Sequence, residues 1–276
     1  MLIGLTAALA AAVVFGASAI CQALGSRKVS ATGTLGLRLA SALLRQPAFL
    51  AALVLNLLGF VLHLVAVRTL PLFLAQAGIA ASLVVTAVLA VRIFHDRLTR
   101  FEWAAVAAVC AGLVALTAAA GSTGEQRATS AAAVGAYAVA GALALLGLLA
   151  SRSRSTAAGA VLSVLAGVGF AATALVARLL PDLGLALLTE PITAALPACG
   201  ALAFLLYSLA LQRSSVTVAT APMIVVQTAL PAVVGVVVLG DEIRSGWGLV
   251  ATASGVITLA AATVLVRFEG ARDHTT

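Results

Sequence analysis

Apolar runs of about 20 residues follow one another along almost the whole chain, and they restrict the fold more than any other feature. A membrane-spanning helix needs about 20 largely apolar residues. Of the 276 residues, 63% are hydrophobic and 9% are charged, whereas about 25% of the residues in a soluble domain are charged. A soluble core cannot bury so much apolar surface under a polar shell. The sequence therefore predicts that most of the chain lies in lipid.

The runs predict nine transmembrane helices. An open sheet would leave backbone groups unpaired in lipid, so each span is expected to be helical. The candidates lie at about 2–21, 48–68, 70–92, 102–120, 130–149, 156–177, 184–211, 216–239 and 246–266. The expected fold class is an all-α membrane protein with about nine spans.

Two segments leave the number and shape of the spans open. Within residues 22–46, a tenth span at about 29–44 would hold only 16 residues and would place Arg38 in the membrane. A cytoplasmic loop with an amphipathic interfacial helix is the favoured interpretation. Residues 184–211 are long for one span and contain Pro191 and Pro197, which indicates a tilted or broken helix.

The lysines and arginines predict an orientation. Twelve of the 16 lie in loops on the side of the C-terminus and four lie in the opposite loops. Because positive loops stay in the cytoplasm, the N-terminus is expected outside and the C-terminus in the cytoplasm, in a bacterial-type inner membrane. The net charge of +7 is spread in short clusters beside the spans, which argues against nucleic-acid binding. The apolar N-terminus lacks the basic start of a secretory signal, so a first span is expected there.

No catalytic motif appears. The chain has no GxSxG elbow, no glycine-rich loop followed by a Walker lysine, and no HExxH pair. Its three cysteines, Cys21, Cys110 and Cys199, are far apart and form no CxxC, so neither a zinc site nor a disulfide framework is indicated. We expect no enzyme activity, no cofactor and no resident metal.

Two junctions between apolar runs are similar. One reads VRIFHDRLTRFEW (91–103) and the other VVVLGDEIRSGW (236–247), each with an acidic residue at the turn and a tryptophan shortly after. They lie within two longer segments, 71–118 and 216–262, that match in pattern. The two copies are expected on opposite sides of the membrane. Inverted repeats of this kind are typical of secondary transporters, which bind substrate near the membrane midplane between the halves.

The turns GDEI (240–243) and HDRL (95–98), each between two spans and followed by a tryptophan, resemble the ends of EamA-type repeats in the drug/metabolite transporter superfamily. The resemblance covers about 48–266. It implies a first repeat at 1–120, with about four spans plus the segment 22–46, and a second at 130–266, with about five spans. A cytoplasmic tail would follow at 267–276.

One branch of that superfamily is also similar at the start of the chain. Nine spans and the opening GLTAALAAAVVFGASAICQALGSRK (4–28) resemble the NIPA-like magnesium transporters. Magnesium is held through carboxylates and waters, and only Glu190 lies plausibly within a predicted span. The composition of the spans therefore does not favour a magnesium ion.

Polar residues inside the apolar runs are the candidates for a binding site, because such residues are costly in lipid. The substrate-binding candidates are Asn56, His63, Gln76, Ser82, Tyr207 and Gln227. Asn56 and His63 are seven residues apart and share a helical face. Ser82 and Gln227 each lie 14 residues before the acidic residue of their junction, which makes them equivalent in the repeat.

Two residues are candidates for carrying a coupling proton. His63 titrates near neutral pH in water, and Glu190 could hold a proton if it were enclosed. A structural interpretation stands beside each candidate. Asn56, His63, Ser82 and Gln227 could bond a neighbouring helix, and Tyr207 and Glu190 could lie at the membrane surface.

With no fixed charge at the midplane, the sequence favours secondary active transport of a small metabolite or an amphipathic solute by alternating access. The expected partners are that solute and membrane lipid, and a homodimer is left open. Three alternatives remain: a lipid or lipid-linked-sugar translocator, a NIPA-like magnesium transporter, and a membrane scaffold subunit that transports nothing.

Overall fold

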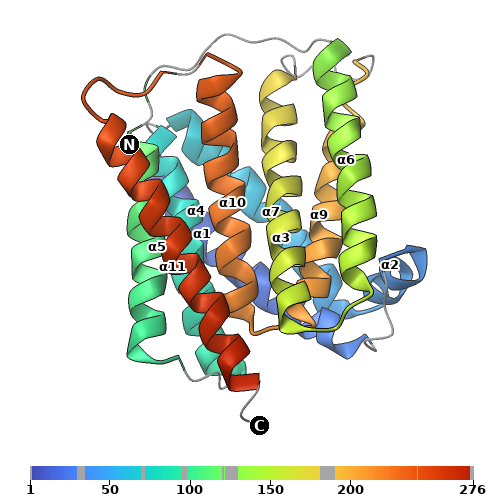
Figure 1. Ribbon diagram of the computed structural model, residues 1–276. Coiled ribbons are helices and arrows are strands. Elements are labelled where there is room, and N and C mark those ends of the chain that lie inside the picture. The colour runs from blue at the N-terminus through green and yellow to red at the C-terminus, as the bar shows by residue number, and fades with distance from the viewer. Residues whose placement is uncertain are drawn as a thin grey trace.

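The chain folds into a bundle of long helices (Figure 1). The computed structural model describes residues 2–29, 35–69, 72–94, 98–119, 121, 130–180, 190–240 and 242–273. Nine helices of 17 residues or more lie in these ranges, together with one short helix. They are α1 (Leu2–Lys28), α2 (Leu37–Leu44), α3 (Pro47–Thr69), α4 (Leu72–Phe94), α5 (Arg100–Ala118), α6 (Ser130–Ser151), α7 (Thr156–Leu179), α9 (Ala195–Leu211), α10 (Val216–Val237) and α11 (Gly248–Asp273). The prediction of an all-helical fold is confirmed for these residues.

Several of these helices are suited to a membrane. Considering the described residues, α1, α6, α7 and α10 are each long and apolar enough to cross one, and α2 with α3 would add a fifth if the bent pair is one span. Large apolar side chains on the outside of the bundle are well exposed, among them Leu57, Val134 and Val161. Lipid is the solvent that suits such a surface. The chain is thus a membrane protein, while the count of nine spans stays a prediction.

The segment predicted to hold an interfacial helix contains α2. Its eight residues extend about 12 Å, which is too short to cross an apolar layer of about 30 Å. The bend between α2 and α3 is 90°. Leu39 and Leu43 are buried, whereas Leu37 and Leu44 are exposed. This amphipathic helix lies where a tenth span was the alternative.

Some helices end at other residues than predicted. The first span was expected to stop at residue 21, but α1 continues to Lys28. The polar side chain of Gln22, just past the expected end, is hydrogen-bonded inside the bundle. The span expected at 184–211 is represented by α9, which starts at Ala195, and residues 181–189 lie outside the described ranges. Pro197 is in the first turn of α9, where its missing N–H is tolerated. α11 continues past residue 266 to Asp273.

The bundle has two ends of different charge. At the basic end lie Lys28, Arg92, Arg100, Arg152 and Arg213, at the end of α1, the end of α4, the start of α5 and the turns around α7 and α9. At the far end α5, α7 and α10 finish and α11 begins. The N-terminus lies at the far end, whereas α2 and the C-terminus lie at the basic end (Figure 1).

Small residues let α1 lie closely between α3 and α4. A Cβ added at Gly16 of α1 would lie 2.6 Å from Cγ1 of Val85 in α4. On the other side of α1, a Cβ added at Gly59 of α3 would lie 2.7 Å from Cε1 of Phe15. Helices in lipid gain little from hydrophobic burial against each other, so van der Waals contact through small residues holds them together.

The helix α7 has a similar place in the second part of the chain. It packs against α9 and α10. A Cβ added at Gly169 would lie 2.8 Å from Cβ of Ala203 in α9, and one added at Gly167 would lie 2.7 Å from the carbonyl oxygen of Met223 in α10. As in α1, glycine permits a backbone approach that any side chain would block.

The helices α5 and α11 run side by side and are joined by backbone hydrogen bonds at the far end. Gly112 of α5 lies against Thr258 of α11. Beyond α5, Gly121 N donates to Glu242 O at 2.8 Å, and Arg244 N donates to Ala119 O at 3.0 Å. Residues 242–244, in and just after the GDEI sequence, are therefore attached to the end of α5, and the positive φ of 71° at Gly240 suits glycine. Asp241 and Asp96 lie outside the described residues.

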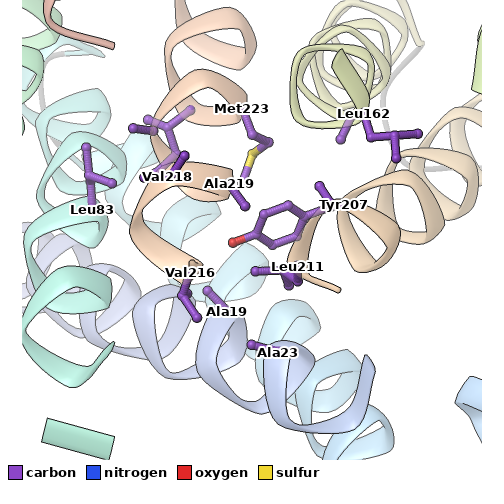
Figure 2. Packing of buried hydrophobic residues seen from close by; sticks show 14 of the residues in the cluster. Ala19, Ala23, Leu83, Leu162, Tyr207, Leu211, Val216, Val218, Ala219 and Met223 are labelled. Carbon is purple, nitrogen blue, oxygen red and sulfur yellow. The ribbon is translucent and has the colours of Figure 1, made fainter. Parts of the chain in front are cut away.

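Buried apolar residues form one large cluster and two small ones. The large cluster reaches from the basic end to the middle of the bundle and includes residues of α1, α4, α5, α9 and α10, among them Ala19, Leu83, Val109, Leu211 and Val218. Figure 2 shows Tyr207, Leu211, Ala219 and Met223 in this cluster. The first small cluster holds Ala7, Ala8 and Ala66, and the second holds Ala133, Ala136, Val176, Ile192 and Ala195.

We predict that Gly16→Val lowers the stability of the protein in detergent by about 1–3 kcal/mol, the usual range for overpacking a tight contact. The added side chain would separate α1 from α4. Gly141→Val is the matched control, because Gly141 in α6 has no atom near its Cβ position, and it should change the stability by less than about 0.5 kcal/mol. Thermal unfolding of both variants measures the difference, and an equal effect would contradict the close contact.

Candidate functional site

Polar groups lie close together at the middle of α10, and one of them is buried without a partner. Pro231 lacks a backbone N–H, so the carbonyl of Gln227 receives no helical hydrogen bond from it. Oγ1 of the next residue, Thr228, is buried and has no hydrogen-bond partner. The side chain of Gln227 is half-buried. We call Gln227, Thr228 and Pro231 the α10 polar turn, and it offers a carbonyl, an amide and a hydroxyl within one turn of helix.

Ser82 lies on α4, a helix that packs against α10. Its side chain is 4% exposed, and its Oγ donates to the carbonyl of Ile79 at 2.6 Å. Its own carbonyl accepts from Thr86 Oγ1 at 2.8 Å. Ser82 and Gln227, which the sequence predicts to be equivalent in the repeat, therefore lie on neighbouring helices. The hydroxyl of Ser82, however, donates within its own helix.

Asn56 and His63 lie on one face of α3, as their spacing predicts, and that face is turned to α1. The carbonyl of Ala52 accepts from Ser18 Oγ of α1 at 2.8 Å, and Ala66 clusters with Ala7 and Ala8 of α1. Positions 52, 56, 59, 63 and 66 follow the helical period, so they form one stripe. Asn56 and His63 therefore lie on the α1-facing side of α3.

The predicted substrate residues consequently fall into two groups. α1 lies between α3 and α4 at Phe15 and Gly16, so Asn56 and His63 are on the other side of α1 from Ser82. Nδ1 of His63 is buried without a hydrogen-bond partner. It is therefore available to bond a solute, or a neighbouring helix after a rearrangement. The side chain of Gln76, also predicted at the site, lies outside the described residues.

Tyr207 lies in the large buried cluster and not at a surface. Its side chain is 2% exposed. Its hydroxyl forms a short hydrogen bond with Oγ1 of Thr220 in α10, and Thr220 in turn donates to the carbonyl of Val216 at 2.6 Å. Figure 2 shows the ring between α9 and α10. In this conformation the tyrosine hydroxyl joins two helices and is not open to a solute.

Glu190 lies at the far end, directly before the turn 191–194 that leads into α9. Its carbonyl accepts from the N–H of Thr193 at 3.1 Å. The next carbonyl, of Pro191, accepts from the hydroxyl of Tyr137 in α6 at 2.7 Å. The side chain of Glu190 is half-buried, and a role for it or for His63 in proton coupling stays a prediction.

A buried glutamine that the sequence placed in a loop joins α1 to α9. The amide Nε2 of Gln22 donates to the carbonyl of Phe204 at 2.9 Å and to Oγ of Ser208 at 2.8 Å. Gln22 is 2% exposed and Ser208 is fully buried. Hydrogen bonds between buried neutral groups inside a membrane protein fix the partners firmly, because no water replaces a broken bond.

The next turn of α1 continues these contacts. Nε2 of Gln212 donates to the carbonyl of Ser26 at 2.7 Å. The guanidinium of Arg27 donates to the carbonyls of Leu211 and Ser214 at 3.3 and 3.2 Å, and it lies 4.4 Å from the ring centre of Phe94. We call these contacts of Gln22, Ser26 and Arg27 the basic-end network. The only sequence feature that could have predicted this network is a glutamine shortly before a basic pair. That feature is weak evidence, because the hydrogen-bond partners are more than 180 residues away.

Comparisons with protein-family models, with curated proteins and with solved structures find no match to this chain. Among the residues that the structure describes, no three histidine, cysteine, aspartate or glutamate side chains gather where they could hold a metal ion.

We predict opposite effects of two Thr→Val substitutions on α10. Thr228→Val removes a buried hydroxyl without a partner and should raise the stability of the solute-free protein by about 1 kcal/mol. Thr220→Val removes the hydroxyl bonded to Tyr207 and should lower the stability by about 1–3 kcal/mol. The two changes are chemically identical and lie on the same helix, so thermal unfolding compares them directly. Equal shifts would contradict the assignment of Thr228 as unpaired.

Proposed function

We propose that the chain is a secondary active transporter that moves a small metabolite or an amphipathic solute by alternating access. In this conformation it is closed at the basic end. One observation carries the proposal. The basic-end network and the large buried cluster join α1 to α9 and α10 at that end. At the far end the two parts are joined beside α5 and α11, by the hydrogen bonds of residues 119–121 with residues 242–244, whereas each small cluster there belongs to one part.

The small clusters support an opening towards the far end among α1, α3, α6 and α7, and not between α5 and α11. Ala7, Ala8 and Ala66 come from α1 and α3 only. The second small cluster comes from α6, α7 and the start of α9. The burial of α10 also decreases from the basic end to the far end. Residues 216–225 are all buried, whereas Val233 and Val237 are 59% and 76% exposed. A transporter that alternates between states has one closed end and one open end.

The packing pattern supports an inverted repeat. α1 packs on α3 and α4, and α4 packs on α5; in the same way α7 packs on α9 and α10, and α10 packs on α11. α1 starts at the far end and α7 starts at the basic end, so the two sets run in opposite directions (Figure 1). In this arrangement α6 is outside both sets. The resemblance of the GDEI and HDRL turns to EamA-type repeats belongs to the same proposal.

Two short stretches add to the repeat. FGASAI (15–20) in α1 is similar to FAATAL (170–175) in α7. GFVLHLVA (59–66) in α3 is similar to AFLLYSLA (203–210) in α9, which makes His63 the counterpart of Tyr207. Tyr207 is hydrogen-bonded at the closed end, and Nδ1 of His63, on the part of α3 nearer the far end, has no partner. Of the two counterparts, the one at the closed end is hydrogen-bonded and the one nearer the far end is not, which is the difference expected between the closed and the open end of an alternating transporter.

The α10 polar turn supports a neutral or zwitterionic solute. It offers an amide, a hydroxyl and a carbonyl, all neutral, next to the residues that pack on α7. A solute that pairs these groups would remove the penalty of about 1–3 kcal/mol for an unpaired buried group. His63 and Asn56, across α1, would become part of the site only with residues of α1.

We predict that a transported solute raises the unfolding temperature of the wild type and is taken up by proteoliposomes. Gln227→Ala should reduce both effects at least fivefold, because it removes a polar group of the α10 polar turn. Gln46→Ala is the matched control, since Gln46 lies at the turn between α2 and α3. Metabolites are screened by thermal shift and by uptake, with and without a pH gradient. A solute that is transported equally by both variants would refute the site.

We predict that Gln22→Leu opens the basic end. Ser208 and Phe204 lose their buried partner, so hydrogen exchange in residues 203–225 should become about tenfold faster. Gln46→Leu again serves as the control and should leave these rates unchanged. Exchange in α5 and α11 should not change in either variant, because these helices are held by other contacts. Equal acceleration in every helix would mean that Gln22 only stabilises the fold, which would contradict a separate closed end.

A further inference from the structure

The helix α2 lies across the basic end with one apolar face turned outward. Leu39 and Leu43 are buried against the bundle, while Leu37 is 90% and Leu44 is 50% exposed. α2 meets α3 at 90°, and Figure 1 shows it beside the lower ends of α6 and α9. A helix at a right angle to a membrane-crossing helix lies along the membrane surface, so Leu37 and Leu44 are at the depth where head groups meet acyl chains.

Arginines accompany these leucines. Arg38 and Arg45 of α2 are exposed, and so are Arg152 and Arg154 in the turn between α6 and α7. The two segments touch, because the N–H of Leu35 donates to Oγ of Ser151 at 3.1 Å. We call Leu37, Leu44 and these four arginines the α2 surface.

None of the described residues in the segments that meet at the α2 surface is acidic. The segments 35–46, 150–155 and 211–215, which meet at this place, contain no aspartate or glutamate. No hydrogen bond or ion pair joins the four guanidinium groups to another described residue. The α2 surface therefore carries four positive charges and a pair of exposed leucines with nothing in the described chain to cover them.

A fifth arginine fixes the turn that carries two of the four. The guanidinium of Arg213 donates to the carbonyls of Ala150 and Ser151 at 3.0 and 2.8 Å, so it satisfies the last carbonyls of α6. Burial and the positive charge of Arg154 lower the pKa of Arg213. The positive charges of Arg154 and Arg213 thus repel each other. A bound anion at this surface would reduce that repulsion.

We propose that the α2 surface binds the head group of an anionic phospholipid. The phosphate pairs with the arginines, and the acyl chains cover Leu37 and Leu44. A lipid fits better than a soluble phosphate because the exposed leucines need an apolar partner. The head-group charge also offsets the repulsion between Arg154 and Arg213, which adjoins Gln212 of the basic-end network. Anionic lipid therefore stabilises the closed basic end. This effect on the closed end rests on the proposed transport function, whereas the binding of the lipid does not depend on it.

The experiment measures thermal unfolding of the full chain in neutral detergent during titration with phosphatidylglycerol. Phosphatidylcholine and inorganic phosphate are titrated in parallel. The variants are Arg38→Gln/Arg45→Gln and Arg152→Gln/Arg154→Gln. Arg92→Gln/Arg100→Gln is the matched control, because it removes two exposed arginines from the same end, on α4 and α5. Arg38→Lys/Arg45→Lys keeps the charge on α2.

Phosphatidylglycerol should stabilise the wild type, and the other two additives should not. Each charge near a membrane surface changes the affinity about fivefold, so each variant at the α2 surface should bind roughly 25-fold more weakly. The control should bind within about twofold of the wild type, and the lysine variant should restore most of the binding. Equal stabilisation by phosphatidylcholine or by inorganic phosphate would overturn the proposal, as would an equal loss in the control. If one glutamine pair prevents folding, the other pair decides.

Discussion

The contact of α1 with both α3 and α4 is the interaction on which the rest of the structure depends. Its basis is the small size of the residues at the two interfaces, since Gly16 lies against Val85 and Gly59 lies against Phe15. In lipid this contact is held by close packing, because apolar burial gives no advantage over the solvent. Only this closeness brings Gln22 within reach of α9 and places Arg27 on the carbonyls that follow it. The polar contacts at the basic end are thus a consequence of small residues elsewhere on the same helix.

Some buried polar groups of the bundle are paired and others are not. At the basic end the buried side chains Gln22, Ser208, Tyr207 and Thr220 are all paired. Oγ1 of Thr217, in the first turn of α10 at the same end, is buried without a partner, as are Oγ1 of Thr228 near the middle of α10 and Nδ1 of His63 on α3. An unpaired buried polar group is unfavourable by about 1–3 kcal/mol, so a fold that keeps such groups has a use for them or a second arrangement that pairs them. These three unpaired groups are the physical reason to consider motion and binding together.

Much of the fold could be predicted because lipid leaves the backbone few choices. Apolar runs had to become helices, and for the weakly apolar stretch around Arg38 a short amphipathic helix was favoured over a tenth span; α2 is found there. The helical period also predicted that Asn56 and His63 share a face. It could not predict that this face meets α1, because sequence periodicity gives the direction of a side chain and not the neighbour. Gln22 was missed for the same reason, since its partners, Phe204 and Ser208, are supplied by a helix near the other end of the chain.

α6 packs on α7 and α9 but has no counterpart in the proposed repeat, and this has a consequence for how such a chain would insert. Each set, α1 to α5 and α7 to α11, contains four long helices, an even number. Two copies of a four-helix unit joined end to end would enter the membrane in the same orientation. One additional crossing between them turns the second copy over. In the inverted repeat that we propose, α6, with Arg152 and Arg154 directly after it, would be the crossing that lets two copies of one unit insert in opposite orientations.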